Sequence, residues 1–152
     1  MPYSSHPIAP EGAARGRLLL DESDVREWGR RFGAASRPPL VVTIAGELGA
    51  GKTTLVQAIC AGYGVTEPVT SPTFALVHEY SSPRSSVLHL DLYRLERQAE
   101  LESLGWDELM GTHALILIEW PERADGMLPP DRVQLALEHA PDDPDHRVLL
   151  AG

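Results

Sequence analysis

The sequence predicts an α/β protein in which helices cover both faces of a mixed β-sheet, giving three layers. Three observations support this prediction. The run Leu40–Ala45 is apolar and rich in β-branched residues, as expected of a strand buried on both faces. A glycine-rich segment and then a helical pattern follow it directly, which is typical of a strand that leads into a helix. A second apolar run, Ala114–Ile118, and several shorter strand-like segments indicate a parallel core extended by antiparallel strands.

The part of the chain before Leu40 is expected to form a tail, a strand and a helix. Residues 1–16 contain three prolines and two glycines without an apolar period, so we expect a disordered tail and a single domain over residues 17–152. Arg17–Leu20 is expected to form a short strand. The acidic segment Asp21–Asp24 has the N-cap and first-turn residues of a helix that ends near Gly33. Three apolar residues would form one face of this helix: Val25, Trp28 and Phe32.

The remaining elements follow the glycine-rich segment. A helix is expected from about Lys52 to Ala61, closed by Gly62 and Gly64. Strands are expected over Thr73–Tyr80, Ser86–Asp91, Arg132–His139 and His146–Leu150, and short helical pieces over Ala99–Leu104 and Trp106–Met110. Alternation in the third of these strands indicates one buried face, made of Val133, Leu135 and Leu137.

Composition excludes several classes of protein. The chain has 152 residues and a formal net charge of −9. Its longest apolar run, Ala114–Ile118, is far shorter than the ~18 residues of a membrane span. The single cysteine, Cys60, excludes an internal disulfide and a cysteine-based zinc site, and is expected to pack as a small hydrophobic residue. We therefore expect a cytoplasmic protein without membrane contact. The acidic charge argues against direct binding to nucleic acid.

A phosphate-binding loop is the strongest motif of the chain. Residues Gly46–Thr53 fit the pattern G-x-x-x-x-G-K-[ST], with a buried strand before it and a helix after it. The loop would present backbone N–H groups to phosphate oxygens. Lys52 would reach the β- and γ-phosphates, and the Thr53 hydroxyl would bind Mg²⁺. Lys52 is the one lysine among thirteen basic residues. The motif and its context predict a P-loop NTPase fold.

The rest of the composition favours ATP as the nucleotide. A guanine-reading Asn-Lys-x-Asp motif is excluded, because the chain has no asparagine and no second lysine. The main alternative to an ATPase is a small P-loop kinase that phosphorylates a metabolite. Its lid would need an arginine such as Arg84, Arg94 or Arg97, but no lid segment stands out. A third hypothesis is a nucleotide-dependent binding module in which hydrolysis is incidental.

Two carboxylates follow strand-like segments and are candidate metal ligands or catalytic groups. Asp91 ends one of these segments, and Glu119 follows the apolar run Ala114–Ile118. The latter run is the more apolar, so we expect it to lie beside the strand of the phosphate loop. Either acid would bind Mg²⁺ or orient the attacking water, and the residues alone leave both assignments open. His89, on the same strand face as Asp91, is interpreted as a core or hydrogen-bonded histidine.

The segment Ser71–Phe74 is a candidate switch. Pro72 stiffens it and Thr73 offers a hydroxyl, as in segments that the γ-phosphate and Mg²⁺ order in P-loop proteins. A plain turn into a strand is the alternative. Trp120 follows Glu119 directly and is expected to lie beside the reaction centre.

Five sequence blocks together resemble one family. In chain order they are Leu48–Thr54 (LGAGKTT), Ser71–Phe74 (SPTF), His89–Leu95 (HLDLYRL), Leu104-Gly105 and Glu119–Glu122 (EWPE). From about Leu18 to His139 the chain resembles the TsaE (YjeE) family of bacterial ATPases of tRNA threonylcarbamoyladenosine (t6A) modification. The blocks that begin at His89 and Glu119 are the specific ones, since the phosphate loop is shared by many families.

The resemblance implies an activity and partners that the residues alone would not show. It implies binding of ATP with Mg²⁺ and hydrolysis that is slow for the protein alone. It also implies an accessory role for the TsaB–TsaD heterodimer, which modifies tRNAs that read codons beginning with A. Contact with tRNA would then be indirect, through the complex, and we expect the protein to be monomeric on its own.

The resemblance also assigns roles to individual residues. Nucleotide contacts are expected from Glu22, Leu48, Gly49, Ala50, Gly51, Lys52, Thr53 and Thr54, with Glu22 near the adenine. Metal ligands are expected among Thr53, Asp91 and Glu119. The catalytic set would be Lys52, Asp91 and Glu119. Further functional positions would be Ser71, Thr73 and Trp120, the last matching a tryptophan that the family needs.

Overall fold

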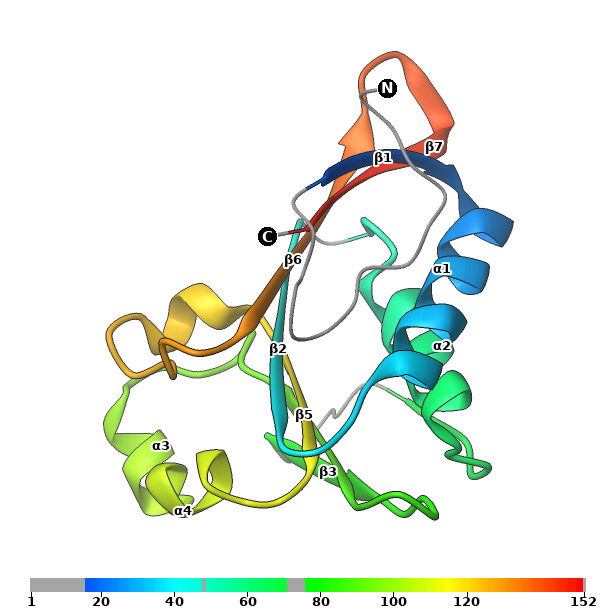
Figure 1. Ribbon diagram of the computed structural model, residues 1–152. Coiled ribbons are helices and arrows are strands. Elements are labelled where there is room, and N and C mark those ends of the chain that lie inside the picture. The colour runs from blue at the N-terminus through cyan, green and yellow to red at the C-terminus, as the bar shows by residue number, and fades with distance from the viewer. Residues whose placement is uncertain (1–15, 48, 71–75, 152) are drawn as a thin grey trace.

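A seven-stranded mixed sheet forms the centre of the protein in a computed structural model that describes residues 16–47, 49–70 and 76–151 (Figure 1). The strands are β1 (Gly16–Asp21), β2 (Leu40–Ala45), β3 (Val77–Tyr80), β4 (Val87–Asp91), β5 (Leu115–Glu119), β6 (Val133–Ala140) and β7 (Asp143–Ala151). The helices are α1 (Glu22–Ala35), α2 (Lys52–Tyr63), α3 (Ala99–Ser103), α4 (Trp106–Met110) and the 3₁₀ helix η1 (Pro121–Ala124).

The order of the strands in the sheet is β1-β7-β6-β2-β5-β4-β3. Strand β2 is parallel to both of its neighbours, β5 and β6, and β4 is parallel to β5. The pairs β1–β7, β6–β7 and β3–β4 are antiparallel. The predicted parallel core with antiparallel extensions is therefore confirmed, and so is the prediction that the strand ending in Glu119 lies next to the strand of the phosphate loop.

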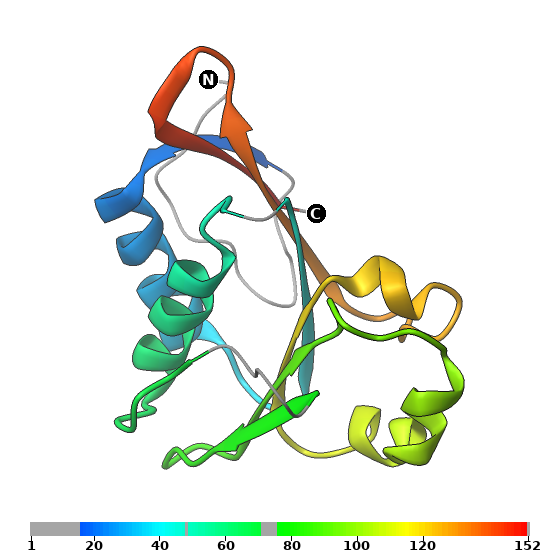
Figure 2. The ribbon, with the colours of Figure 1, turned by 180° about the vertical axis from the view of Figure 1, so that it is seen from behind.

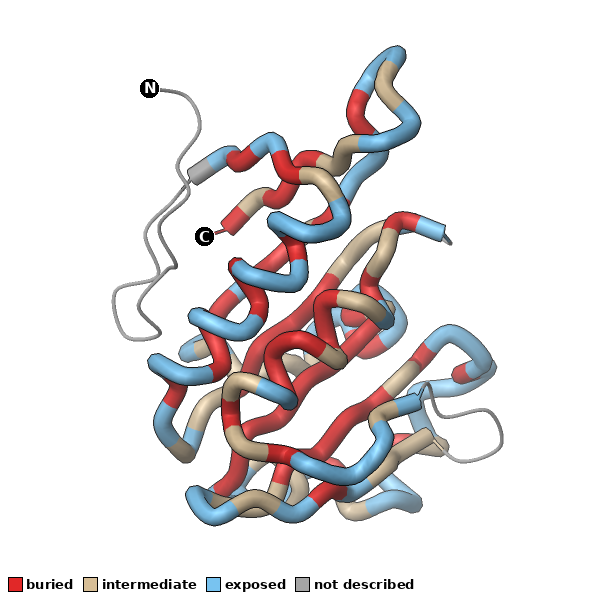
Figure 3. Tube along the Cα trace, turned by 90° about the vertical axis from the view of Figure 1, so that its right-hand side faces the viewer, coloured by how far each residue is buried: buried red, intermediate tan, exposed pale blue. Residues whose placement is uncertain are grey.

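Helices cover both faces of this sheet. Helices α1 and α2 lie on one face, and α3 and α4 on the other (Figure 2). Successive residues of β5 alternate between the two cores: Leu115 and Leu117 pack on the α1–α2 side, whereas Ile116 and Ile118 pack on the α3–α4 side. The central strands are accordingly buried almost throughout (Figure 3), which explains why their sequences are continuous apolar runs.

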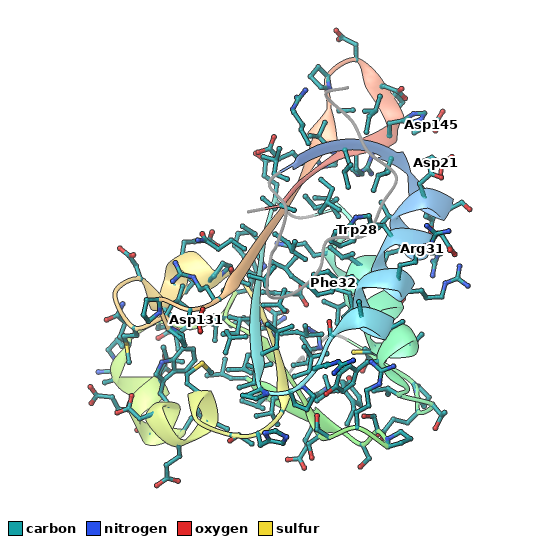
Figure 4. The ribbon with its side chains drawn as sticks, in the orientation of Figure 1. Asp21, Trp28, Arg31, Phe32, Asp131 and Asp145 are labelled. Atoms are coloured by element: carbon teal, nitrogen blue, oxygen red, sulfur yellow. The ribbon has the colours of Figure 1, made fainter. Side chains whose placement is uncertain are left out.

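Helix α1 begins where the sequence predicts. The Asp21 side chain accepts a hydrogen bond from the Asp24 N–H at 2.7 Å, and the Asp24 side chain accepts one from the Asp21 N–H at 3.3 Å. This reciprocal capping box satisfies two backbone donors at the helix start. Trp28 and Phe32 point from α1 towards the sheet, whereas Arg31 points away from it (Figure 4). The predicted apolar face is therefore the buried one.

Several boundaries differ from the predictions by a few residues. Helix α2 continues past Gly62, and Gly64 is its C-cap. Strand β7 begins three residues earlier than predicted, because Ala140 pairs with Asp143 across a two-residue turn. Asp142 in this turn has a positive φ of 58°. Of the strand predicted over residues 73–80, the structure describes residues 76–80, and Val77–Tyr80 form β3.

Among the described residues, no helix is both long and apolar enough to cross a membrane.

Glycines allow α1 and α2 to pack closely against each other. A Cβ atom added at Gly62 would overlap the carbonyl oxygen of Arg30, and one added at Gly33 would overlap that of Ile59. Neither obstacle is the end of a flexible side chain, so the helices would have to move apart.

Gly62→Ala is therefore expected to lower the free energy of unfolding by about 1–3 kcal/mol, despite the better helix propensity of alanine. Urea unfolding followed by circular dichroism measures this change. Gly111→Ala is the matched control, because a Cβ there makes ordinary contacts at 3.4 Å or more and its φ of −89° suits any residue. Equal stability of the two variants would contradict the close-packing argument.

Candidate functional site

The phosphate loop connects β2 to α2 and depends on left-handed glycines. Gly49 and Gly51 have φ values of 77° and 98°, a region that other residues adopt at a cost. Gly51 is also the N-cap of α2, where the helix exposes its first N–H groups. A Cβ at Gly46 would overlap the carbonyl oxygen of Leu137 on β6. The loop is thus confined between β6 and the start of α2.

Lys52, the first residue of α2, is buried although it is a lysine; its exposed fraction is 5%. Its ammonium donates a hydrogen bond to the carbonyl oxygen of Gly46 and lies 3.6 Å from the centroid of the Trp120 ring. Burial lowers the pKa of Lys52, and the charge of Glu119 acts against this effect. The ammonium therefore sits at the loop, on an aromatic face, with carboxylates near it.

Glu119 and Asp91 end two neighbouring parallel strands and lie opposite each other in the register of β4 and β5. Glu119 is 3% exposed, and its Oε2 lies 2.6 Å from Nε2 of His89, which is fully buried. Asp91 is half-buried and accepts a hydrogen bond from the Tyr93 N–H at 3.0 Å. Burial raises the pKa of Asp91, the Tyr93 N–H lowers it, and the Glu119 charge raises it. His89 is thus the hydrogen-bonded histidine that the sequence predicts.

Trp120 has a left-handed backbone, with φ 57° and ψ 51°, directly before Pro121. This conformation is uncommon for a bulky residue and turns the chain sharply from β5 into η1. The Trp120 ring packs at 4.9 Å from the Tyr93 ring and covers the Lys52 ammonium. Trp120 therefore lies against Lys52 and directly follows Glu119. The 3₁₀ helix after Trp120 is not predicted, because a strained single residue leaves no periodic signal.

A cavity of about 600 Å³ lies on the other side of the phosphate loop, between α1 and the β6–β7 hairpin. It is lined by Asp21, Glu22, Ser23, Val25, Gly49, Ala50, Gly51, Thr54, Leu137, Pro144, Asp145 and Arg147. Two of these residues, Asp21 at the end of β1 and Asp145 in β7, are labelled in Figure 4. Glu22, at the start of α1, lies on the wall of this cavity and pairs with Arg26 at 3.0 Å. The loop therefore separates a cavity on the β7 side from the carboxylates on the β4 side.

The structure brings most of the predicted site residues together around one loop. Leu48, Ser71 and Thr73 lie outside the described residues. Arg84, a candidate lid arginine, lies elsewhere and donates to the carbonyl oxygens of Gly33, Ala34 and Ser36 at 2.8–3.1 Å. Cys60 is buried in α2, and burial raises the pKa of its thiol to about 12. One wall residue, Arg147, has no counterpart in the predictions, because no local motif surrounds it.

The donors available for a metal are oxygen atoms. Thr53 lies in the first turn of α2, and the Asp91 and Glu119 carboxylates are at adjoining strand ends. Mg²⁺ prefers oxygen ligands and normally combines one or two carboxylates with phosphate oxygens and water, so this donor set fits Mg²⁺. In the part of the chain that the structure describes, His, Cys, Asp and Glu side chains form no group of three or more that would hold a metal by themselves.

The phosphate loop lies between a parallel strand and the helix that follows it, in a mixed sheet with helices on both faces. This arrangement defines an α/β protein of the P-loop NTPase type. The chain belongs to the TsaE family: the family model described as "Threonylcarbamoyl adenosine biosynthesis protein TsaE" matches residues 19–148. Members of this family take part in the biosynthesis of t6A in tRNA.

Individual relatives agree with this assignment. The Bacillus subtilis tRNA threonylcarbamoyladenosine biosynthesis protein TsaE is 38% identical over 110 residues, which is 72% of this chain and 68% of the relative. The Haemophilus influenzae protein of the same name is 35% identical over 131 residues, 83% of each chain. The crystal structure of Bacillus subtilis YdiB superposes with a TM-score of 0.74 at 28% identity, covering 91% of this chain and 86% of that one.

Proposed function

We propose that this chain is a Mg²⁺-dependent ATPase that supports t6A modification of tRNAs reading codons that begin with A, as an accessory of the TsaB–TsaD transferase. One observation supports the ATPase most directly. Lys52, the only lysine of the chain, is the first residue of α2 and directly follows the glycine-rich loop. It is close enough to the Glu119 and Asp91 carboxylates for their negative charges to raise its pKa against the effect of burial. Family membership supports the role in t6A biosynthesis.

In the proposed reaction, the loop N–H groups and the start of α2 bind the phosphate oxygens. Lys52 exchanges the Gly46 carbonyl and the Trp120 ring for the β- and γ-phosphates. The nucleoside would lie in the cavity beside Glu22 and Thr54. This arrangement explains why one loop adjoins both a cavity large enough for a nucleoside and a pair of carboxylates.

Glu119 is the group proposed to act on the attacking water or to hold the metal, and Asp91 takes the other role. The 2.6 Å contact with His89 restricts the Glu119 carboxylate to one orientation. Mg²⁺, when bound, supplies positive charge that neutralises the phosphates, and Thr53 and one of the two carboxylates would hold it.

The proposed partner is a protein pair, and contact with tRNA is indirect. The net charge of −9 favours this arrangement, because a protein that neutralises tRNA phosphates needs clustered Lys and Arg. Measuring the ATPase rate with and without TsaB–TsaD and tRNA tests the proposal. We expect stimulation by the complex, and absence of both stimulation and complex formation would refute the accessory role.

A small-molecule kinase is the competing activity. Such a kinase needs an arginine in its lid. Arg84 does not support this role, because its guanidinium donates hydrogen bonds to backbone carbonyls at the end of α1. Incubation with γ-labelled ATP and a panel of metabolites separates the two activities. We expect the label in inorganic phosphate, and transfer to a metabolite would overturn the ATPase assignment.

A further inference from the structure

Arg147 connects the β6–β7 hairpin to the phosphate loop. It lies on β7, opposite Leu20 of β1 and His139 of β6 in the sheet register. Its Nε donates to the carbonyl oxygen of Ala50 at 3.2 Å, and its Nη2 donates to that of Gly49 at 3.5 Å. Arg147 therefore contacts two consecutive loop carbonyls from a position almost one hundred residues later in the chain.

The guanidinium is itself held by its own hairpin. Its Nη1 donates to the carbonyl oxygens of Pro144 at 3.0 Å and His146 at 2.9 Å. A planar guanidinium with several donors in fixed directions can bind the hairpin and the loop at the same time, which a lysine ammonium on a flexible stem would do less well. Arg147 is thus a rigid bridge between the two segments.

The two carbonyls that Arg147 binds matter for the geometry of the loop. A phosphate loop binds its ligand through N–H groups that point inward, so the adjoining carbonyl oxygens must point outward. Gly49 and Gly51 give this loop wide backbone freedom, since neither has a side chain to restrict it. Holding the Ala50 carbonyl on the outside would select the inward orientation of the Gly51 N–H, which belongs to the same peptide group, before the ligand arrives. The Gly49 carbonyl shares its peptide group with the Ala50 N–H, which in the free protein donates to the carbonyl oxygen of Glu47 at 3.2 Å. Such preorganisation improves affinity by reducing the ordering cost of binding.

We propose that Arg147 is a positioning residue of the nucleotide site, which holds the phosphate loop in its binding conformation through the carbonyls of Gly49 and Ala50. This inference rests on the proposed ATPase function. It assigns to β7 a role in nucleotide affinity, because Arg147 contacts the loop on the cavity side, away from the Glu119 and Asp91 carboxylates. The rate of the chemical step should depend little on it.

The test compares Arg147→Gln and Arg147→Lys with the control Arg31→Gln in the full chain. Arg31 is also an arginine with a hydrogen-bonded side chain, but it lies on the exposed face of α1 and pairs with Glu27. In Arg147→Gln we expect the Kd for Mg-ATP to rise about tenfold or more, as for the loss of hydrogen bonds from a charged group. The rate at saturating ATP should stay within about twofold of wild type. Arg31→Gln should leave both quantities unchanged.

Hydrogen exchange of the loop amides supplies a readout that does not depend on activity. Without nucleotide, the amides of residues 49–53 should exchange faster in Arg147→Gln than in wild type and Arg31→Gln, while β2 exchanges equally in all three. Unchanged loop exchange or an unchanged Kd in Arg147→Gln would overturn the proposal. If wild type itself binds no ATP, the proposed function fails, and the exchange data still report whether Arg147 orders the loop.

Arg147→Lys separates positioning from charge and also guards against a variant that fails to fold. The lysine retains the positive charge but not the fork that spans two carbonyls, so we expect a Kd between those of wild type and Arg147→Gln. Wild-type affinity in Arg147→Lys together with fast loop exchange would mean that the charge acts on the nucleotide itself, and the positioning role would be wrong.

Discussion

Lys52→Ala is expected to reduce ATP turnover by at least about 10²-fold, because it removes the ammonium that we propose stabilises charge on the transferring phosphate. No other lysine of the chain can replace it. The substitution also removes the hydrogen bond to the Gly46 carbonyl and the contact with the Trp120 ring. Steady-state release of inorganic phosphate measures the turnover, and titration with Mg-ATP measures the binding.

Lys52→Arg is the informative comparison for this variant. It keeps the charge, but the larger planar group does not fit a buried position that is 5% exposed in the wild type. We expect it to remain strongly impaired although it folds, which thermal unfolding checks. Wild-type turnover in Lys52→Ala would refute the assignment of Gly46–Thr53 as the phosphate loop.

Glu119→Gln is expected to lower the rate of hydrolysis by about 10²–10³-fold while the Kd for Mg-ATP changes by only about threefold or less. The amide has the shape of the carboxylate and keeps a polar partner for His89 at the 2.6 Å contact, so the core around it should remain intact. What it loses is the negative charge and the ability to accept a proton. Single-turnover hydrolysis and equilibrium binding of ATP separate the two effects.

Two further variants sharpen this experiment. Asp91→Asn makes the same chemical change at the adjacent strand end, and comparing the Mg²⁺ dependence of the two variants indicates which carboxylate holds the metal. Glu138→Gln on the exposed side of β6 is the control for loss of one negative charge and should behave as wild type. If Glu119→Gln hydrolyses no ATP and t6A formation still proceeds at the full rate, hydrolysis is incidental and the protein is a nucleotide-dependent binding module.

Local sequence patterns predict the central elements well. The bounds of β2 agree with the predicted strand at both ends, because burial on both faces leaves a run with no polar residue except Thr43. The start of α1 is also predicted, since the capping box is formed by residues three apart in sequence. The phosphate loop is recognisable for the same reason: its glycines, lysine and threonine all lie within the eight residues Gly46–Thr53, at the spacing typical of loops that bind phosphates.

Features that depend on contacts between distant segments are the ones that the sequence does not predict. The sharp turn at Trp120 is specified by packing against Tyr93 and Lys52, which no period along the chain reveals. The sheet order places β6 and β7 beside β2 and so forms one wall of the cavity from the end of the chain. Local interactions do not specify such an order, because strand pairing is decided by the burial of whole faces.

By itself, the sequence therefore determined the fold class, the family and the chemistry available at the loop. Each of these follows from residues that are neighbours in the chain or that recur with a regular period. Only the tertiary structure decided that His89 restrains Glu119 and that Arg147 binds the loop at Gly49 and Ala50. The physical reason is that both contacts join segments far apart in the chain: strands β4 and β5 in the first case, and strand β7 and the phosphate loop in the second. The approach of such segments depends on how the sheet assembles and leaves no signature in the local sequence.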